Sequence, residues 1–147
     1  MGLFDNLLGG AEDTARLSPQ EAFAGILMGA SACDGHFADD ETQSLVSALM
    51  RMKLFSRFTE KQFNQTLDRL HGMIKRSGVP ALIDRCIPSL PSDLRDTAFA
   101  NACNIVLADG VAEQAERDFI NRLQQLLGLD NNSATAIVQV MVIKNQG

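Results

Sequence analysis

Two segments of the chain share a pattern of acidic residues that could bind a metal ion. They are residues 34–41, DGHFADDE, and residues 109–116, DGVAEQAE. Each begins Asp-Gly-x-apolar and has a Glu seven residues after the Asp. Hard cations such as Ca²⁺ and Mg²⁺ take carboxylate oxygens as ligands. The candidate metal ligands are therefore Asp34, Glu41, Asp109 and Glu116.

The spacing also matches the second half of an EF-hand calcium loop, in which the Asp is a ligand, the Gly makes the turn and the Glu binds with both oxygens. The positions that would supply the first two carboxylates hold Ala30 and Ala32 in one copy and Ile105 and Leu107 in the other. Neither segment is therefore an ordinary EF-hand, and an ion would need ligands pooled from both copies or completed by water. The further carboxylates available nearby are Asp39, Asp40 and Glu113. An all-oxygen set of this kind suits Ca²⁺ or Mg²⁺.

The Asp-Gly spacing also has a purely structural explanation. A Gly at the end of a helix adopts a left-handed conformation at no steric cost, and a Glu in the first turn of the next helix complements the helix dipole. For one copy alone this explanation is the stronger one. Two copies with the same polar residues, both flanked by further acids, favour ion binding.

The other reactive residues form no recognised catalytic set. Cys33 and His36 flank the first Asp-Gly turn, but one Cys and one His are too few for a closed zinc site. There is no Ser/His/Asp set, phosphate-binding glycine loop or HExxH motif. We therefore expect a protein that is not an enzyme, and we identify no small-molecule substrate. The three cysteines include no CxxC pair, which fits a reducing compartment.

Helical signals surround both Asp-Gly turns. Residues 18–21, SPQE, combine an N-cap Ser with a first-turn Pro and a Glu that completes a capping box. Ser92 is expected to cap a later helix, and Gly128 to end the one after it. The predicted helices cover approximately residues 18–33, 39–52, 59–77, 82–87, 92–106, 119–127 and 133–143.

The last predicted helix contains a stretch typical of a strand, because residues 138–142, VQVMV, are rich in β-branched side chains. A lone strand in an otherwise helical chain has no partner for its backbone hydrogen bonds, so we expect a buried helix. The sequence therefore predicts an all-α protein of about seven helices in one compact domain, residues 18–147.

Residues 1–17 form a separate N-terminal amphipathic segment and linker. Their apolar side chains cluster on one side of two helical turns, which suits either peripheral contact with a membrane or partner, or packing on the same domain. The second role is favoured, because the segment lacks the Lys and Arg of a membrane-surface helix. With no secretory signal and no bilayer-spanning run, we expect a cytoplasmic protein.

The charge of the chain limits its partners. A formal net charge of −5 and a pI near 4.9 argue against a protein whose main task is to bind nucleic acid. Residues 1–50 hold 1 basic and 8 acidic side chains, residues 51–96 hold 9 and 5, and residues 97–147 hold 3 and 5. The basic middle third is either a solvated helix face or a docking surface for an acidic partner or anionic lipid.

The sequence resembles the TerB family of tellurite-resistance proteins and its relatives, which include the N-terminal domain of DnaJ-like co-chaperones. The resemblance covers residues 18–143 and rests on residues 32–35, ACDG, followed by Glu41, and residues 107–110, LADG, followed by Glu116. It implies about seven helices with internal pseudo-twofold symmetry that brings the two Asp-Gly turns together. It also implies an acidic patch associated with metal binding, and a role in stress and tellurium-oxyanion resistance.

Two functional hypotheses follow from the sequence. In the first, a non-enzymatic TerB-like domain binds a divalent cation, or a partner, through the acidic turns in a stress-response setting. In the second, the domain is a metal-free scaffold that meets different protein partners through separate acidic and basic faces.

Overall fold

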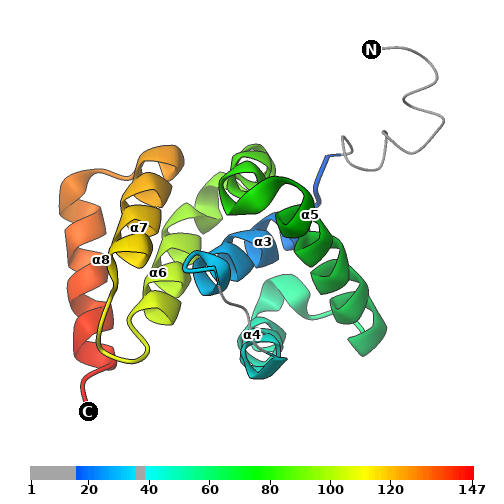
Figure 1. The fold of residues 1–147 in the computed structure, drawn as a ribbon, viewed down its shortest axis with the longest axis horizontal. Helices are drawn as coiled ribbons and strands as arrows, with labels where there is room; N and C mark the ends of the chain where they lie inside the picture. The colour runs from blue at the N-terminus through cyan, green and yellow to red at the C-terminus, as the bar shows by residue number, and fades with distance from the viewer. Residues whose placement is uncertain (1–15, 36–38) are drawn as a thin grey trace.

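The computed structural model describes residues 16–35 and 39–147, and for Asp39 and Asp40 it describes the backbone alone. Over these residues the chain is helical and contains no strand (Figure 1), so the all-α prediction is confirmed. Its α-helices are α3 (Pro19–Ala32), α4 (Asp39–Met50), α5 (Glu60–Cys86), α6 (Arg95–Val106), α7 (Gln114–Leu127) and α8 (Asn131–Lys144). Short 3₁₀ helices cover Lys53–Phe55, Ile87–Ser89 and Ser92–Leu94.

The number of helical segments agrees with the number predicted from the sequence, because α5 contains a break. Gly78 interrupts α5, because its φ of 86° and ψ of 165° lie outside the helical region. Pro80 lies two residues further on and, having no backbone N–H, is suited to the first turn of the segment after the break. The six described α-helices thus comprise seven helical segments, because α5 is divided at the gap between the predicted helices 59–77 and 82–87.

Side-chain caps fix where several helices begin. Ser18 and Glu21 form the predicted capping box, with the Ser18 N–H donating to Glu21 Oε1 at 2.9 Å and the Glu21 N–H donating to Ser18 Oγ at 3.1 Å. Asp130 Oδ1 accepts from the Ser133 N–H at 2.7 Å at the start of α8, and this bond holds the pKa of Asp130 below its ordinary value. Gly128 ends α7 in the left-handed conformation, as predicted.

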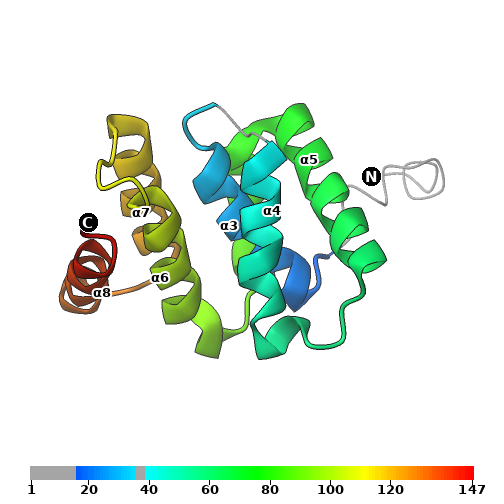
Figure 2. The same ribbon diagram turned by 90° about the horizontal axis from the view of Figure 1, so that it is seen from below.

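The α3 helix forms the centre of the domain. Every residue from Ala22 to Ala30 is buried, and the helix contacts α4, α5, α6 and α7 (Figures 1 and 2). A helix that is apolar on all sides is stable only when neighbours surround it. Gly25 and Gly29 let α5 approach closely: a Cβ at Gly25 would lie 2.5 Å from Cys86 Sγ.

Two details of the predicted helices are wrong. Ser92 does not cap α6, because it begins a 3₁₀ turn and α6 starts at Arg95 without a side-chain cap. The α8 helix is not buried: it packs on one side, against α6, and its only buried residue is Ala134. Val140 and Ile143 on its outer side are 56% and 68% exposed.

Two further expectations concern the surroundings of the domain. Of the amphipathic segment 1–17, residues 1–15 lie outside the described part of the chain. No helix among the residues that the structure describes is long and apolar enough to cross a membrane.

Candidate acidic cleft

The two Asp-Gly turns have the same backbone geometry. In the first, the Gly35 N–H donates to the Ala32 carbonyl at 2.9 Å, and in the second the Gly110 N–H donates to the Leu107 carbonyl at 2.9 Å. Both glycines have positive φ, 90° and 81°. Each turn also joins two helices, α3 to α4 and α6 to α7. The repeat seen in the sequence is therefore a structural repeat as well.

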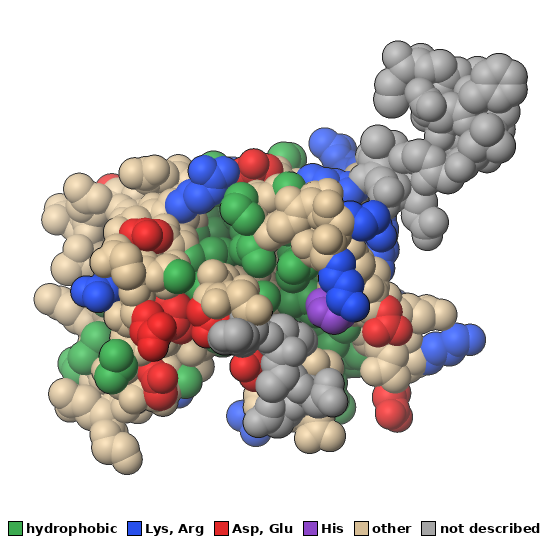
Figure 3. Space-filling model, viewed as in Figure 1, with side chains coloured by type: hydrophobic (Ala, Val, Ile, Leu, Met, Phe, Trp, Pro, Cys, Tyr) green, Lys and Arg blue, Asp and Glu red, His purple; other side chains and the backbone are tan. Residues whose placement is uncertain are grey.

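Both turns open onto one cleft. Acidic side chains gather beside the α6–α7 connection on the face shown in Figure 3, and a cavity of about 450 Å³ lies between α3, α4 and α6 with the start of α7. The four candidate ligands all line it: Asp34, Glu41, Asp109 and Glu116. Its remaining walls are small or apolar, with Ser31, Ser44 and Asn104 as further oxygen-bearing side chains. The structure thus brings together residues that are up to 82 positions apart in the sequence.

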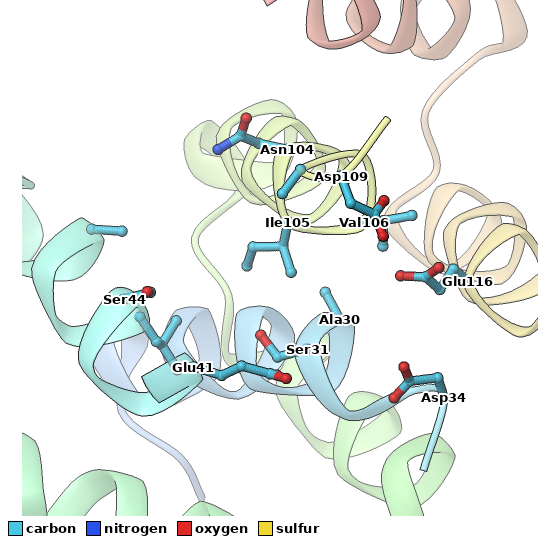
Figure 4. Close-up of a pocket in the computed structure, with 13 residues that line it drawn as sticks. Ala30, Ser31, Asp34, Glu41, Ser44, Asn104, Ile105, Val106, Asp109 and Glu116 are labelled. Atoms are coloured by element: carbon cyan, nitrogen blue, oxygen red, sulfur yellow. The ribbon is translucent and has the colours of Figure 1, made fainter. Parts of the chain in front are cut away.

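The carboxylates approach the cleft from different helices (Figure 4). Asp34 follows α3, Asp109 follows α6 and Glu116 belongs to the first turn of α7; these three lie at one end, while Glu41 reaches from α4 beneath Ser31. Asp109 Oδ1 accepts from the Val111 N–H at 3.0 Å, and Glu116 Oε1 accepts from the Glu113 N–H at 3.0 Å. Each of these bonds orients a carboxylate while using one of its two oxygens.

The cleft is not a preformed metal centre. Among the described side chains, no group of three or more His, Cys, Asp and Glu is close enough to hold an ion. Glu113, one of the additional candidates, is exposed at the N-cap of α7 and does not line the cavity. The side chains of Asp39 and Asp40, the other two, and of His36 lie outside the described part of the structure.

The Cys33 thiol lies beside the acidic cleft and is held protonated. Burial, together with the negative charges of Glu116 and Asp34, raises the pKa of Cys33 to about 11. Its Sγ donates to the Ala30 carbonyl at 3.3 Å. Because the thiolate is the reactive form of cysteine, this environment opposes nucleophilic chemistry at neutral pH.

A second cavity was not foreseen from the sequence. It has a volume of about 210 Å³ and is lined mainly by apolar side chains from the end of α3, the second half of α5 and α7. We call it the apolar pocket; its lining residues are Cys33, Val79, Pro80, Ile83, Ala115, Asp118, Phe119, Arg122 and Leu123. These residues come from three helices and share no motif, so the sequence carried no signal for it.

The fold and the cleft define a class of protein: a helical domain in which two equivalent Asp-Gly turns line one acidic cavity. A comparison with family models identifies the family: the model described as Tellurite resistance protein TerB matches residues 20–139. The chain belongs to this family, as its resemblance in sequence indicated. Searches of curated proteins and of solved structures found no significant match.

Proposed function

We propose that the acidic cleft binds a hydrated divalent cation, Ca²⁺ or Mg²⁺, with carboxylates supplied by both Asp-Gly turns. The observation that carries the proposal is that Asp34, Glu41, Asp109 and Glu116, from two separate turns, line one cavity. Four carboxylates in one open cleft repel each other, and a divalent cation relieves that repulsion.

The spacing of these side chains favours an ion that keeps part of its water. No three of the described carboxylates meet at one point, whereas Mg²⁺ retains several waters and is commonly held by one or two carboxylates. A cavity of about 450 Å³ has room for such a hydrated ion. We therefore expect weak binding, with Kd on the order of 10⁻⁴–10⁻³ M, the range of the weakest Ca²⁺-binding modules.

The proposed role is binding, without catalysis. The protonated state of Cys33 supports this, as does the lack of a recognised catalytic motif. Because the family is named for tellurite resistance, we place the cation-dependent function in a stress-response setting.

A metal-free scaffold is the second candidate. Figure 3 supports it: Lys and Arg side chains gather over α5, apart from the acidic side chains beside the α6–α7 connection. In this case the acidic cleft would recognise a basic partner, and α5 an acidic one.

Thermal unfolding with added metal separates the two candidates. At ten times Kd a bound cation stabilises the fold by about 1.4 kcal/mol, so Mg²⁺ or Ca²⁺ at millimolar concentrations should raise Tm. The double variant Asp34→Asn/Asp109→Asn should lose this shift. The control Asp68→Asn/Asp93→Asn removes the same charge from exposed positions outside the cleft and should keep it. A Tm that does not respond to either metal would reject the cation site and leave the scaffold.

A further inference from the structure

The apolar pocket has the size and lining of a site for one large apolar side chain. Its volume of about 210 Å³ is below the roughly 300–1,000 Å³ of most small-molecule and cofactor sites. Val79 and Ile83 from α5 and Phe119 from α7 supply its apolar walls. Gly29 lies at the same junction, because a Cβ there would meet Ile83, Phe119 and Val79 within 3.4 Å. At protein interfaces, a few residues buried in well-packed pockets supply most of the binding energy.

The apolar pocket adjoins the acidic cleft. Cys33 lines the pocket while its neighbour Asp34 lines the cleft, and on α7 Ala115 lines the pocket while Glu116 lines the cleft. In Figure 3, exposed hydrophobic side chains fill a hollow between α7 and α5, with acidic side chains beside it. One ligand can therefore contact the pocket and the cleft together.

The charges around the pocket select the ligand. At one end, Arg122 pairs with Asp84, with Nη2 and Oδ1 2.9 Å apart, so this arginine is already balanced. Asp118 adds a further carboxylate to the lining, where its Oδ1 accepts from Gln114 Nε2 at 2.7 Å. With the four acids of the cleft, the surroundings are strongly negative, which favours a partner that carries Lys or Arg beside its apolar residue.

We propose that the apolar pocket and the acidic cleft together bind a peptide segment of a partner protein, with one large apolar residue in the pocket and flanking basic residues over the cleft. This inference goes beyond the proposed cation site, because it uses the negative charge of the cleft and does not depend on a metal being bound there. Glu116 and Asp34 attract the basic residues, and Val79, Ile83 and Phe119 enclose the anchor.

The test uses a fluorescein-labelled peptide, Gly-Lys-Lys-Leu-Lys-Lys-Gly, titrated with the full chain in EDTA and followed by fluorescence anisotropy. Replacing the peptide's Leu with Ser should weaken binding about tenfold, since the burial of one Leu is lost. In the protein, Ala115→Met narrows the pocket from an exposed position and should weaken binding by a similar factor. The control Ala136→Met makes the same change at an exposed position of α8, outside the pocket, and should leave binding unchanged.

Two results would overturn the proposal. One is that the Leu peptide does not bind at a protein concentration of about 1 mM, which would mean a Kd weaker than millimolar. The other is equal binding of the Leu and Ser peptides, which would reveal charge attraction alone. If Ala115→Met does not fold, as judged by circular dichroism, the wild-type ¹⁵N spectrum decides: the Leu peptide must shift the amide signals of Val79, Ile83 and Phe119. Because EDTA removes metal, the result is independent of whether the cleft binds a cation.

Discussion

Gly35 and Gly110 hold the two turns in a conformation that other residues adopt only with strain. Their φ angles of 90° and 81° lie in the region that glycine enters freely, because it lacks a Cβ. Among the described residues other than its chain neighbours, a Cβ at either position would meet no atom within 4 Å, so a substitution there strains the backbone without a clash with these residues. Each glycine therefore sets the direction in which its neighbouring Asp faces the cleft.

Replacing either turn glycine with alanine should destabilise the domain. We expect Gly35→Ala and Gly110→Ala each to lower the free energy of unfolding in urea by about 1–2 kcal/mol, the cost of a left-handed L-residue. Gly72→Ala is the matched control, because Gly72 lies within α5 without positive φ and alanine favours a helix by up to about 1 kcal/mol. Equal effects at all three positions would contradict the strain explanation.

The buried thiols should make the free energy of unfolding depend on pH in the alkaline range. Burial raises the pKa of Cys103 from 9.0 to about 12, so the folded state keeps a proton that the unfolded state releases above about pH 9. The stability that the folded state gains with a protonated Cys103 is fully present below pH 9 and is lost as the pH rises toward 12. The free energy of unfolding should therefore fall less steeply between pH 9 and pH 11 in Cys103→Ala than in the wild type.

The control for this prediction is Val106→Ala, which removes a buried side chain from the same helix without removing an ionisable group. It should lower stability by a similar amount at every pH and keep the slope of the wild type. A Cys103→Ala slope that matches that of Val106→Ala would show that the thiol does not titrate differently in the two states.

At the scale of the helices, the crossing of α3 and α5 depends on two glycines of α3, Gly25 and Gly29. A Cβ at Gly25 would lie 2.5 Å from Cys86 Sγ, so Gly25→Ala should destabilise the fold by about 1–3 kcal/mol through overpacking. The second change Cys86→Ala removes the sulfur and should recover part of the loss in a double-mutant cycle measured by urea unfolding. Gly29→Ala, whose Cβ would instead meet Ile83 Cδ1 at 2.8 Å, should not be recovered by Cys86→Ala.

The helices were predictable where local chemistry determines their ends. Ser18 and Gly128 act through bonds to residues within a few positions, so their types and spacing were sufficient. The start of α6 and the exposure of α8 were not, because they depend on packing between distant segments. The apolar side chain of Ile143, for example, does not by itself reveal that no neighbouring helix covers most of it in the described structure.

At the scale of the molecule, the sequence predicted the residues of the acidic cleft because each turn repeats the same short pattern. The apolar pocket could not be predicted in this way, since Cys33, Val79 and Phe119 meet only after three helices have packed. The net charge of −5 likewise concealed an uneven arrangement, with acids gathered beside the Asp-Gly turns and basic residues over α5. Charge therefore divides the described surface into an acidic cleft and a basic helix, which is the arrangement that both proposed functions require.

The central claim is that the two turns share one cation, and paramagnetic Mn²⁺ tests it most directly. Mn²⁺ takes oxygen ligands as Mg²⁺ does, and it broadens the NMR signals of nearby amides. Substoichiometric Mn²⁺ should broaden the Gly35 and Gly110 amide signals in parallel, and Asp34→Asn alone should reduce the broadening at both. Broadening that Asp34→Asn removes at Gly35 while leaving Gly110 unchanged would contradict a shared site.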